Sequence, residues 1–312
     1  MKFKSIKVVV LIILIGATIK TAKAQQEPMY TQYMFNTLSV NPAYTGTTNA
    51  LNVLALTRLQ WVGVEGAPKT YTLAVHTPLN EKKAGVGFSI VSDEIGPVKN
   101  FYLSATYAYR IRITEGTTLS LGLKGGFYNY TVGLSRLDLT QNNDIAFQQD
   151  QQKKFHPNMG FGTYYYSDKW YAGIAIPKLF QNDLTKQAPS SNSLSEMKRH
   201  YFLIAGYVFK INQDLALKPS FVEKVVTGAP LSTDITAQLF YRERFWFGAS
   251  YRIGDAVAFL FEMRVNDQLM LGYSYDITLN KLNGMSRGSH EILLSFDFDK
   301  FSPRKIKSPR YF

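Results

Sequence analysis

The sequence predicts an all-β protein, a transmembrane antiparallel up-and-down β-barrel of about 14 strands. Apolar and polar residues alternate from about residue 49 to residue 298, as strands with two different faces require. After the first 24 residues, no apolar run approaches the roughly 18 residues of a transmembrane helix. Aromatic residues make up 14% of the chain, including 20 Tyr and 21 Phe, which suits the aromatic girdles of outer-membrane barrels.

Residues 1–24 have the features of a secretory signal peptide. Lys2, Lys4 and Lys7 precede an apolar run of about 12 residues, and Ala22 and Ala24 form a small-x-small cleavage pattern before Gln25. The alternative is a retained membrane anchor, but the run is too short to span a bilayer. We therefore expect the mature chain to begin at residue 25.

Residues 25–48, QQEPMYTQYMFNTLSVNPAYTGTT, form a lead-in that is too polar for a core strand and too aromatic for a loose linker. Asn41-Pro42 should break any strand, because proline removes a donor and restricts the residue before it. We expect the segment to fold across or into the periplasmic mouth and partly plug the barrel; the alternative is an interfacial lead-in to the first strand. The predicted plug contacts are Tyr30, Gln32, Tyr33, Phe35, Asn36, Asn41, Pro42 and Tyr44.

Residues 49–298 form the predicted barrel. The expected strands lie near 49–61, 69–79, 83–91, 99–113, 117–130, 156–167, 169–178, 198–211, 215–226, 232–242, 244–253, 256–266, 269–278 and 289–298. Glycines at alternate positions, as in GVGF (85–88) and GFGT (160–163), ease curvature or let another segment approach, and we interpret them as barrel geometry rather than cofactor loops.

The connections distinguish a barrel from a secreted β-sandwich. Those after even-numbered strands are short, such as TEGT and INQD, whereas several after odd-numbered strands are longer: 92–99, 131–155, 177–198 and 278–289. Outer-membrane barrels have short periplasmic turns and longer external loops, and a sandwich has no reason to sort its loops this way. An even strand count then predicts that both mature termini are periplasmic.

Charged residues on the polar strand faces should point into the lumen. We expect an ion-pair network bracing the wall among Arg252, Glu262, Arg264, Asp276 and Glu291; solvated lumen charges without a special role are the alternative. Further residues expected inside are Arg110, Arg112, Lys124, Asp234 and Asp297. A lumen lined in this way is also compatible with conduction of small solutes.

The charge and motif content excludes several function classes. The formal net charge of +12 comes mostly from five leader lysines and four bases in the tail, so it does not indicate nucleic-acid binding. There is no cysteine, the four histidines lack ligand-like spacing, and no phosphate-binding or dinucleotide motif is present. In the single local candidate, Ser289-His290-Glu291, neighbouring side chains point to opposite strand faces. We expect no enzyme activity, cofactor or metal.

Two further segments are candidate contact surfaces. The basic tail, 299–312, carries Arg304, Lys305, Lys307 and Arg310 and two prolines; it is expected to dock on an acidic periplasmic partner or to remain a solvated end. The Gln- and Asn-rich stretch 131–154 is a candidate cargo-facing loop, with an ordinary surface loop as the alternative.

The chain resembles the PorP/SprF family of outer-membrane proteins of the Bacteroidota type IX secretion and gliding system. The resemblance covers essentially the whole mature chain and rests on blocks rather than one motif. These blocks are QQEPMYTQYMFNTLSVNPAYTGT, HPNMGFGTYYYSDKWYAGIAIPKLF, RHYFLIAGYVF, LKPS, FWFGASYRIGDA, LGYSYDI, SHEILLSF and the tail ending in RYF.

The resemblance implies an accessory barrel embedded in outer-membrane lipids that exports or retains a cargo protein, including large surface adhesins with a type IX C-terminal signal. It also implies contacts with periplasmic and lipoprotein components of the secretion machine. It brings no catalytic residues and does not identify the cargo. The alternative function is an outer-membrane porin or channel for small solutes.

Overall fold

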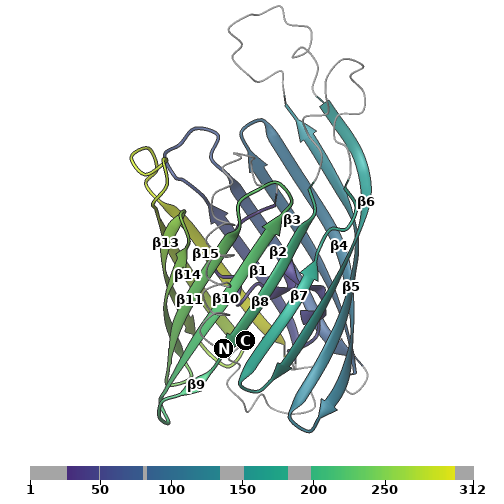
Figure 1. The fold of residues 1–312 in the computed structure, drawn as a ribbon, viewed down its shortest axis with the longest axis vertical. Coiled ribbons are helices and arrows are strands. Elements are labelled where there is room, and N and C mark those ends of the chain that lie inside the picture. Colours follow the sequence, from purple (N-terminus) through teal and green to yellow (C-terminus); the bar gives the residue numbers. More distant parts are fainter. Residues whose placement is uncertain (1–26, 49, 80–82, 134–150, 182–197, 299–312) are drawn as a thin grey trace, which may run out of the picture.

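The strands of the protein form one closed antiparallel barrel (Figure 1). The computed structural model describes residues 27–48, 50–79, 83–133, 151–181 and 198–298. Strands that follow one another along the chain pair with each other, and β1 pairs with β15 from Leu51 opposite Phe298 to Leu59 opposite His290. This last pairing closes the sheet, so that among the described strands neither β1 nor β15 has a free edge toward lipid.

The strand bounds agree with the alternation in the sequence. They are β1 (Leu51–Leu59), β2 (Lys69–Leu79), β3 (Ala84–Ile95), β4 (Val98–Thr114), β5 (Thr117–Val132), β6 (Gln151–Ser167), β7 (Trp170–Ile176), β8 (His200–Tyr207), β9 (Phe209–Lys210), β10 (Leu215–Val226), β11 (Ser232–Tyr241), β12 (Phe245–Arg252), β13 (Ala256–Arg264), β14 (Leu269–Thr278) and β15 (Ser289–Phe298). Because β8 and β9 both pair with β10 and lie one after the other, they count as one barrel strand. The prediction of a barrel of about 14 strands is therefore confirmed.

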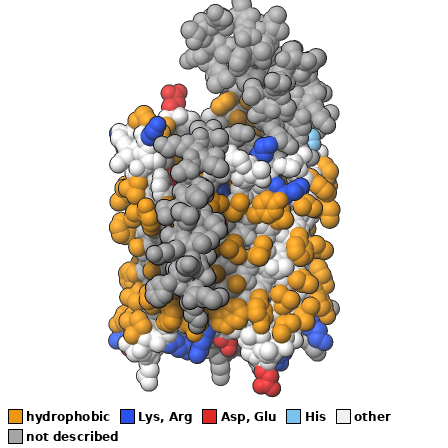
Figure 2. All heavy atoms as spheres, in the orientation of Figure 1, with side chains coloured by type: hydrophobic (Ala, Val, Ile, Leu, Met, Phe, Trp, Pro, Cys, Tyr) orange, Lys and Arg blue, Asp and Glu red, His pale blue; other side chains and the backbone are white. Residues whose placement is uncertain are grey.

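The two faces of each strand have different chemistry. Along β4, Tyr102, Ser104 and Thr106 are buried toward the lumen, whereas Tyr107 and Tyr109 point outward and are about half exposed. Figure 2 shows hydrophobic side chains covering the outer wall in a broad band, with charged side chains near its two ends. An apolar outer band between polar rims is what the hydrocarbon core of a bilayer requires.

One residue expected inside lies elsewhere. Arg112 is exposed and donates hydrogen bonds to the carbonyls of Thr114 and Glu115. The register of β4 against β5 shifts between Arg112 and Thr114, and this bulge at the strand end ends the inward alternation.

Long and short connections lie at opposite ends of the barrel, as predicted, with one correction. We call the end with connections 60–68, 227–231 and 279–288 the long-loop end, and the end with 115–116, 242–244 and 265–268 the short-turn end. The stretch 92–99 is not a long loop, because β3 and β4 extend to Ile95 and Val98 and leave a two-residue turn. Its polar residues pair across the strands, with Glu94 and Lys99 in an exposed ion pair of 3.2 Å.

The segment before β1 contains the two short helices of the described structure, α2 (Thr37–Val40) and the 3-10 turn η1 (Pro42–Tyr44). Asn41 lies between them and Pro42 opens η1, which confirms that Asn41-Pro42 interrupts any strand. In the described ranges, no helix is long and apolar enough to cross a membrane.

Candidate functional site in the lumen

The N-terminal segment, residues 27–48, lies inside the barrel and touches several walls. The Tyr30 hydroxyl is 2.8 Å from the Thr72 hydroxyl on β2, and the Asn41 side-chain amide donates to the Thr163 carbonyl on β6 at 2.9 Å. Of the eight predicted plug contacts, Phe35 is partly buried and the other seven are buried. The structure therefore brings these residues together within the lumen.

The segment runs along the barrel rather than only across one mouth. Glu27 contacts Lys178, in the connection after β7 at the long-loop end. Thr45 and Gly46 lie at the short-turn end, where the Thr45 carbonyl accepts from Arg110 and the Gly46 amide donates to His76. Glu27 and Phe298, the first and last described residues, therefore lie at opposite ends, although Leu51 and Phe298, where the barrel strands begin and end, lie at the same end as strand parity requires. Glu27 lies at the other end because the segment preceding β1 crosses back through the lumen. The mature termini themselves lie outside the described residues, so their common side stays a prediction.

An ion-pair network lies beside residues 30–32 of this segment. Arg58 on β1 pairs with Asp276 at 2.7 Å and with Glu291 at 3.1 Å. Arg252 on β12 pairs with Asp234 at 2.8 Å and approaches Asp276 at 3.9 Å. These side chains are almost fully buried, and such charges are tolerated only when each has a charged or hydrogen-bonding partner.

The N-terminal segment forms several of the hydrogen bonds to these buried charges. The backbone amides of Thr31 and Gln32 donate to the two carboxylate oxygens of Glu291 at 2.9 and 2.8 Å. The Thr31 hydroxyl donates to Asp276, and Arg252 donates to the Tyr30 carbonyl at 2.7 Å. The network thus joins the segment to β1, β12, β14 and β15.

Two residues predicted for this network lie apart from it. Glu262 is fully buried and accepts from Gln238 at 3.4 Å. Arg264 lies opposite Met270 near the short-turn end, with its guanidinium 5.6 Å from the Trp246 ring centre, whereas Asp276 lies opposite Ala258. Glu262 and Arg264 therefore lie at a different depth along the barrel axis from Asp276. The spacing of residues along β13 could not show this difference, because every second position faces the lumen.

Wall glycines make room for the middle of the segment. A side chain at Gly122 on β5 would collide with the backbone of Pro42 and Ala43, and one at Gly162 on β6 would collide with the Asn41 side chain. The Asn41 Oδ1 atom also accepts from the Ala43 amide at 2.9 Å. The alternate glycines of the strands thus let another segment approach closely, which is one of the two roles expected for GFGT.

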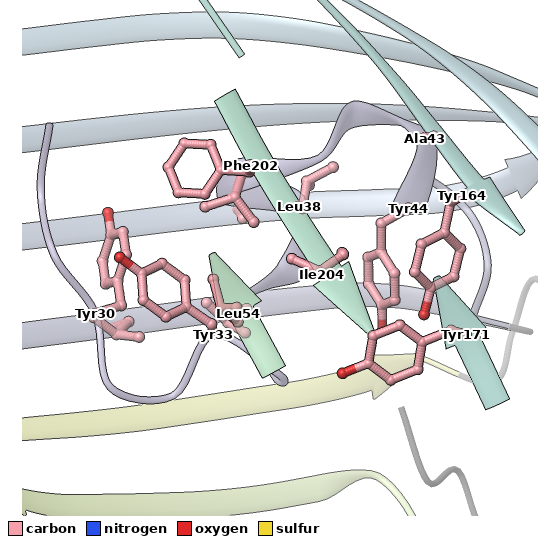
Figure 3. Close-up of a cluster of buried hydrophobic side chains, with 14 of the residues drawn as sticks. Tyr30, Tyr33, Leu38, Ala43, Tyr44, Leu54, Tyr164, Tyr171, Phe202 and Ile204 are labelled. Carbon is pink, nitrogen blue, oxygen red and sulfur yellow. The ribbon is translucent and has the colours of Figure 1, made fainter. Parts of the chain in front are cut away.

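Aromatic side chains pack around the same region (Figure 3). Tyr44 meets Tyr164 edge-on at 5.7 Å, and Tyr164 stacks on Tyr171 at 5.5 Å. Tyr30 and Tyr33 meet edge-on at 5.6 Å near Leu54. Large aromatic rings bury much surface, so the segment is held by packing as well as by polar contacts.

A second charged group lies at the long-loop end, and we call it the mouth site. The Glu27 carboxylate is 2.7 Å from the Lys178 amine, whose nitrogen lies 4.7 and 4.9 Å from the ring centres of Tyr102 and Tyr128. Burial by itself raises the pKa of the Glu27 carboxyl, but the charges of Lys178, His200 and Lys124 outweigh it and hold that pKa below its ordinary value. The carboxylate therefore stays ionised at neutral pH.

Sequence reasoning missed three of these residues. Arg58 shares a strand face with Asn52, Leu54 and Leu56, so the apolar character of that face hid it. Glu27 and Lys178 lie far apart in the sequence, outside any strand, and no pattern relates them. The leader, the tail residues Arg304, Lys305, Lys307 and Arg310, and positions 134–150 lie outside the described residues. Those predictions stay predictions. Positions 131–132 and 151–154 of the predicted loop belong to β5 and β6, because the two strands extend further than the alternation indicated.

Comparisons with known proteins find one family and several solved structures that are similar to this chain. Residues 22–296 match the family described as Type IX secretion system membrane protein PorP/SprF. A search of curated proteins finds no match. Among solved structures, the Acinetobacter baumannii outer membrane protein Omp33 has a TM-score of 0.48 at 9% identity, covering 80% of this chain and 98% of that one. The Ralstonia pickettii toluene transporter TbuX has a TM-score of 0.47 at 11% identity, covering 83% and 92%. Similarity at this level says nothing about ligands or activity.

Proposed function

Because the chain belongs to the PorP/SprF family of type IX secretion system membrane proteins, we propose that it is an accessory barrel of protein secretion and gliding in the outer membrane of a Gram-negative, Bacteroidota-like bacterium. In this role it binds or anchors a secreted cargo protein or surface adhesin with a type IX C-terminal domain. It also contacts periplasmic and lipoprotein components of the machine. The role is non-enzymatic and uses no cofactor.

The N-terminal segment inside the lumen is the observation that supports this proposal over a porin. The N-terminal segment is held at three depths, by Glu27 on Lys178, by Thr31 and Gln32 on Glu291, and by Asn41 on Thr163. A general solute channel needs a continuous water-filled path. A barrel that contains a buried segment is better suited to presenting a rigid surface to a protein partner.

Each end of the barrel carries one of the two segments that we propose as contact surfaces for partner proteins. With short turns in the periplasm, the long-loop end faces the cell surface and offers the stretch 131–154 to cargo. β15 ends at Phe298 at the short-turn end, and the basic tail that follows it in the sequence, with Arg304, Lys305, Lys307 and Arg310, would meet an acidic periplasmic partner. We expect no nucleic-acid partner for this protein.

A pull-down from the native envelope tests the proposal. The full chain with an affinity tag in an exposed short turn, such as 242–244, is extracted in mild detergent, and co-purifying proteins are identified by mass spectrometry. We expect a large surface protein with a type IX signal together with secretion-machine components, and less recovery when the four tail bases are replaced by glutamine. Recovery of neither class from a folded, membrane-inserted barrel would refute the proposal.

A further inference from the structure

The mouth site has the chemistry of a carboxylate receptor that the protein's own chain fills. Lys178 lies against the faces of Tyr102 and Tyr128, and the Lys124 nitrogen lies 4.9 Å from the Tyr102 ring centre. Cation–π contacts hold both ammonium groups in place without neutralising their charge. Glu27 supplies the carboxylate, with side-chain exposures of 13% for Glu27 and 9% for Lys178.

The electrostatic surroundings favour an anion at this position. Lys178, His200 and Lys124 all stabilise the charge on Glu27, and they come from the connection after β7, from β8 and from β5. Asp93 lines the same pocket as Glu27, and it accepts a hydrogen bond from the Thr70 hydroxyl at 2.6 Å. Removing the Glu27 charge therefore leaves buried cations without their carboxylate, which is costly unless another anion replaces it.

Among the described residues, cavities adjoin the mouth site. A cavity at the long-loop end is lined by Glu27, Pro28 and Met29 together with Trp61 and Leu231. Glu27 and Pro28 also line the adjoining pocket that contains Lys124 and Lys178. An extended peptide entering from the long-loop end would thus first meet a cavity that apolar residues line together with Asp93, Arg252 and Asp255, and then the basic site.

We propose that the mouth site binds an acidic side chain of an extended peptide from a partner protein, and that Glu27 occupies it in the resting barrel as an internal competitor. The inference rests on the proposed function and adds the chemistry of the recognised segment. Displacement of residues 27–29 by such a peptide leaves the deeper contacts of Thr31, Gln32 and Asn41 in place. Partner binding is thereby coupled to release of the chain's own N-terminal end.

The test uses purified full-length barrels and two fluorescent peptides, QQEPM and QQQPM, which differ only in the acidic residue. Fluorescence anisotropy measures their affinity for the wild type, Glu27→Gln, Glu27→Gln/Lys178→Gln and Glu27→Gln/Lys178→Arg. We expect QQEPM to bind Glu27→Gln about tenfold more tightly than the wild type, since a charged hydrogen bond contributes on that order. QQQPM should show no such gain.

The remaining variants decide whether the gain belongs to the mouth site. It should disappear in Glu27→Gln/Lys178→Gln and persist in Glu27→Gln/Lys178→Arg, while Glu94→Gln, which removes the exposed carboxylate paired with Lys99, behaves as the wild type. Heat-modifiable gel migration verifies that each barrel is folded. Equal binding of both peptides to folded Glu27→Gln, or no binding, would overturn the inference. Because only purified barrel is used, that result is independent of the envelope pull-down.

Discussion

Asn41 of the N-terminal segment lies against Gly162 of β6 so closely that a Cβ at Gly162 would overlap the Asn41 Oδ1 atom. The Asn41 side chain also bonds to the Thr163 carbonyl and to the Ala43 amide. The wall and the segment are thus shaped for each other, and this contact makes the attachment of the segment measurable.

Gly162→Ala should lower the free energy of unfolding by about 1–3 kcal/mol, because the added methyl group overpacks a tight contact. The matched control is Gly125→Ala on β5, where a Cβ would meet nothing within 4 Å and the change should stay within about 0.5 kcal/mol. Urea unfolding of barrels refolded in detergent measures both. Equal effects at the two positions would show that the segment does not press on the wall.

Deleting residues 25–44 should open the barrel, since it removes the Glu27, Thr31, Gln32 and Asn41 contacts that cross the lumen. Planar-bilayer recordings of the purified protein should show little steady conductance for the full chain and a larger, stable one for the deletion. An unchanged conductance would remove the plug hypothesis. A large steady conductance in the full chain would favour the porin alternative.

Arg58→Met should cost about 3–5 kcal/mol of stability, because it leaves the buried carboxylates of Asp276 and Glu291 without their main cation. Lys99→Met breaks the Lys99–Glu94 pair, whose side chains are about half exposed, and should cost no more than about 1 kcal/mol. The same urea titration compares the two variants. If Arg58→Met loses only a little stability, then water or the N-terminal segment must supply the hydrogen bonds that Asp276 and Glu291 need.

The Glu27–Lys178 pair predicts a stability difference that depends on pH. The folded pKa of Glu27 lies below the ordinary value of 4.5, so its stabilisation is present above the unfolded pKa and is lost as pH falls through the folded pKa. Melting temperatures of the wild type and Glu27→Gln should therefore differ at pH 7 and converge as the pH falls below about 4.5. A difference that stays constant through this range would contradict the ion pair as its source.

Cysteine labelling tests on which side each end of the described chain lies, and the absence of native cysteine makes single substitutions clean. Met29→Cys should react with a membrane-impermeant maleimide on intact cells, as should Met285→Cys between β14 and β15. Glu243→Cys, in a short turn, should react only after the outer membrane is permeabilised. If Met29→Cys, like Glu243→Cys, reacts only after permeabilisation, the start of the N-terminal segment lies on the periplasmic side instead.

The barrel was readable from the sequence because each strand carries its own evidence. A strand between lipid and lumen repeats its apolar and polar residues with period two, so β4 reveals both faces within one stretch of chain. The sequence predicted a long loop around Gly96–Pro97 because Asp93, Glu94 and Lys99 are polar. In the structure these residues belong to β3 and β4, where they pair with residues of the opposite strand, and the alternation of apolar and polar residues does not reveal that pairing.

By itself, the sequence determined the barrel, its strands and the break at Asn41-Pro42, because these depend on alternation and on the backbone limits of proline. The tertiary structure alone decided which lumen charges meet and how far the N-terminal segment travels. Arg58 joins Asp276 and Glu291, and Glu27 reaches Lys178, across 151 or more positions of chain. Such contacts form only when closure brings distant strands to one depth of the lumen, and no local pattern encodes that depth.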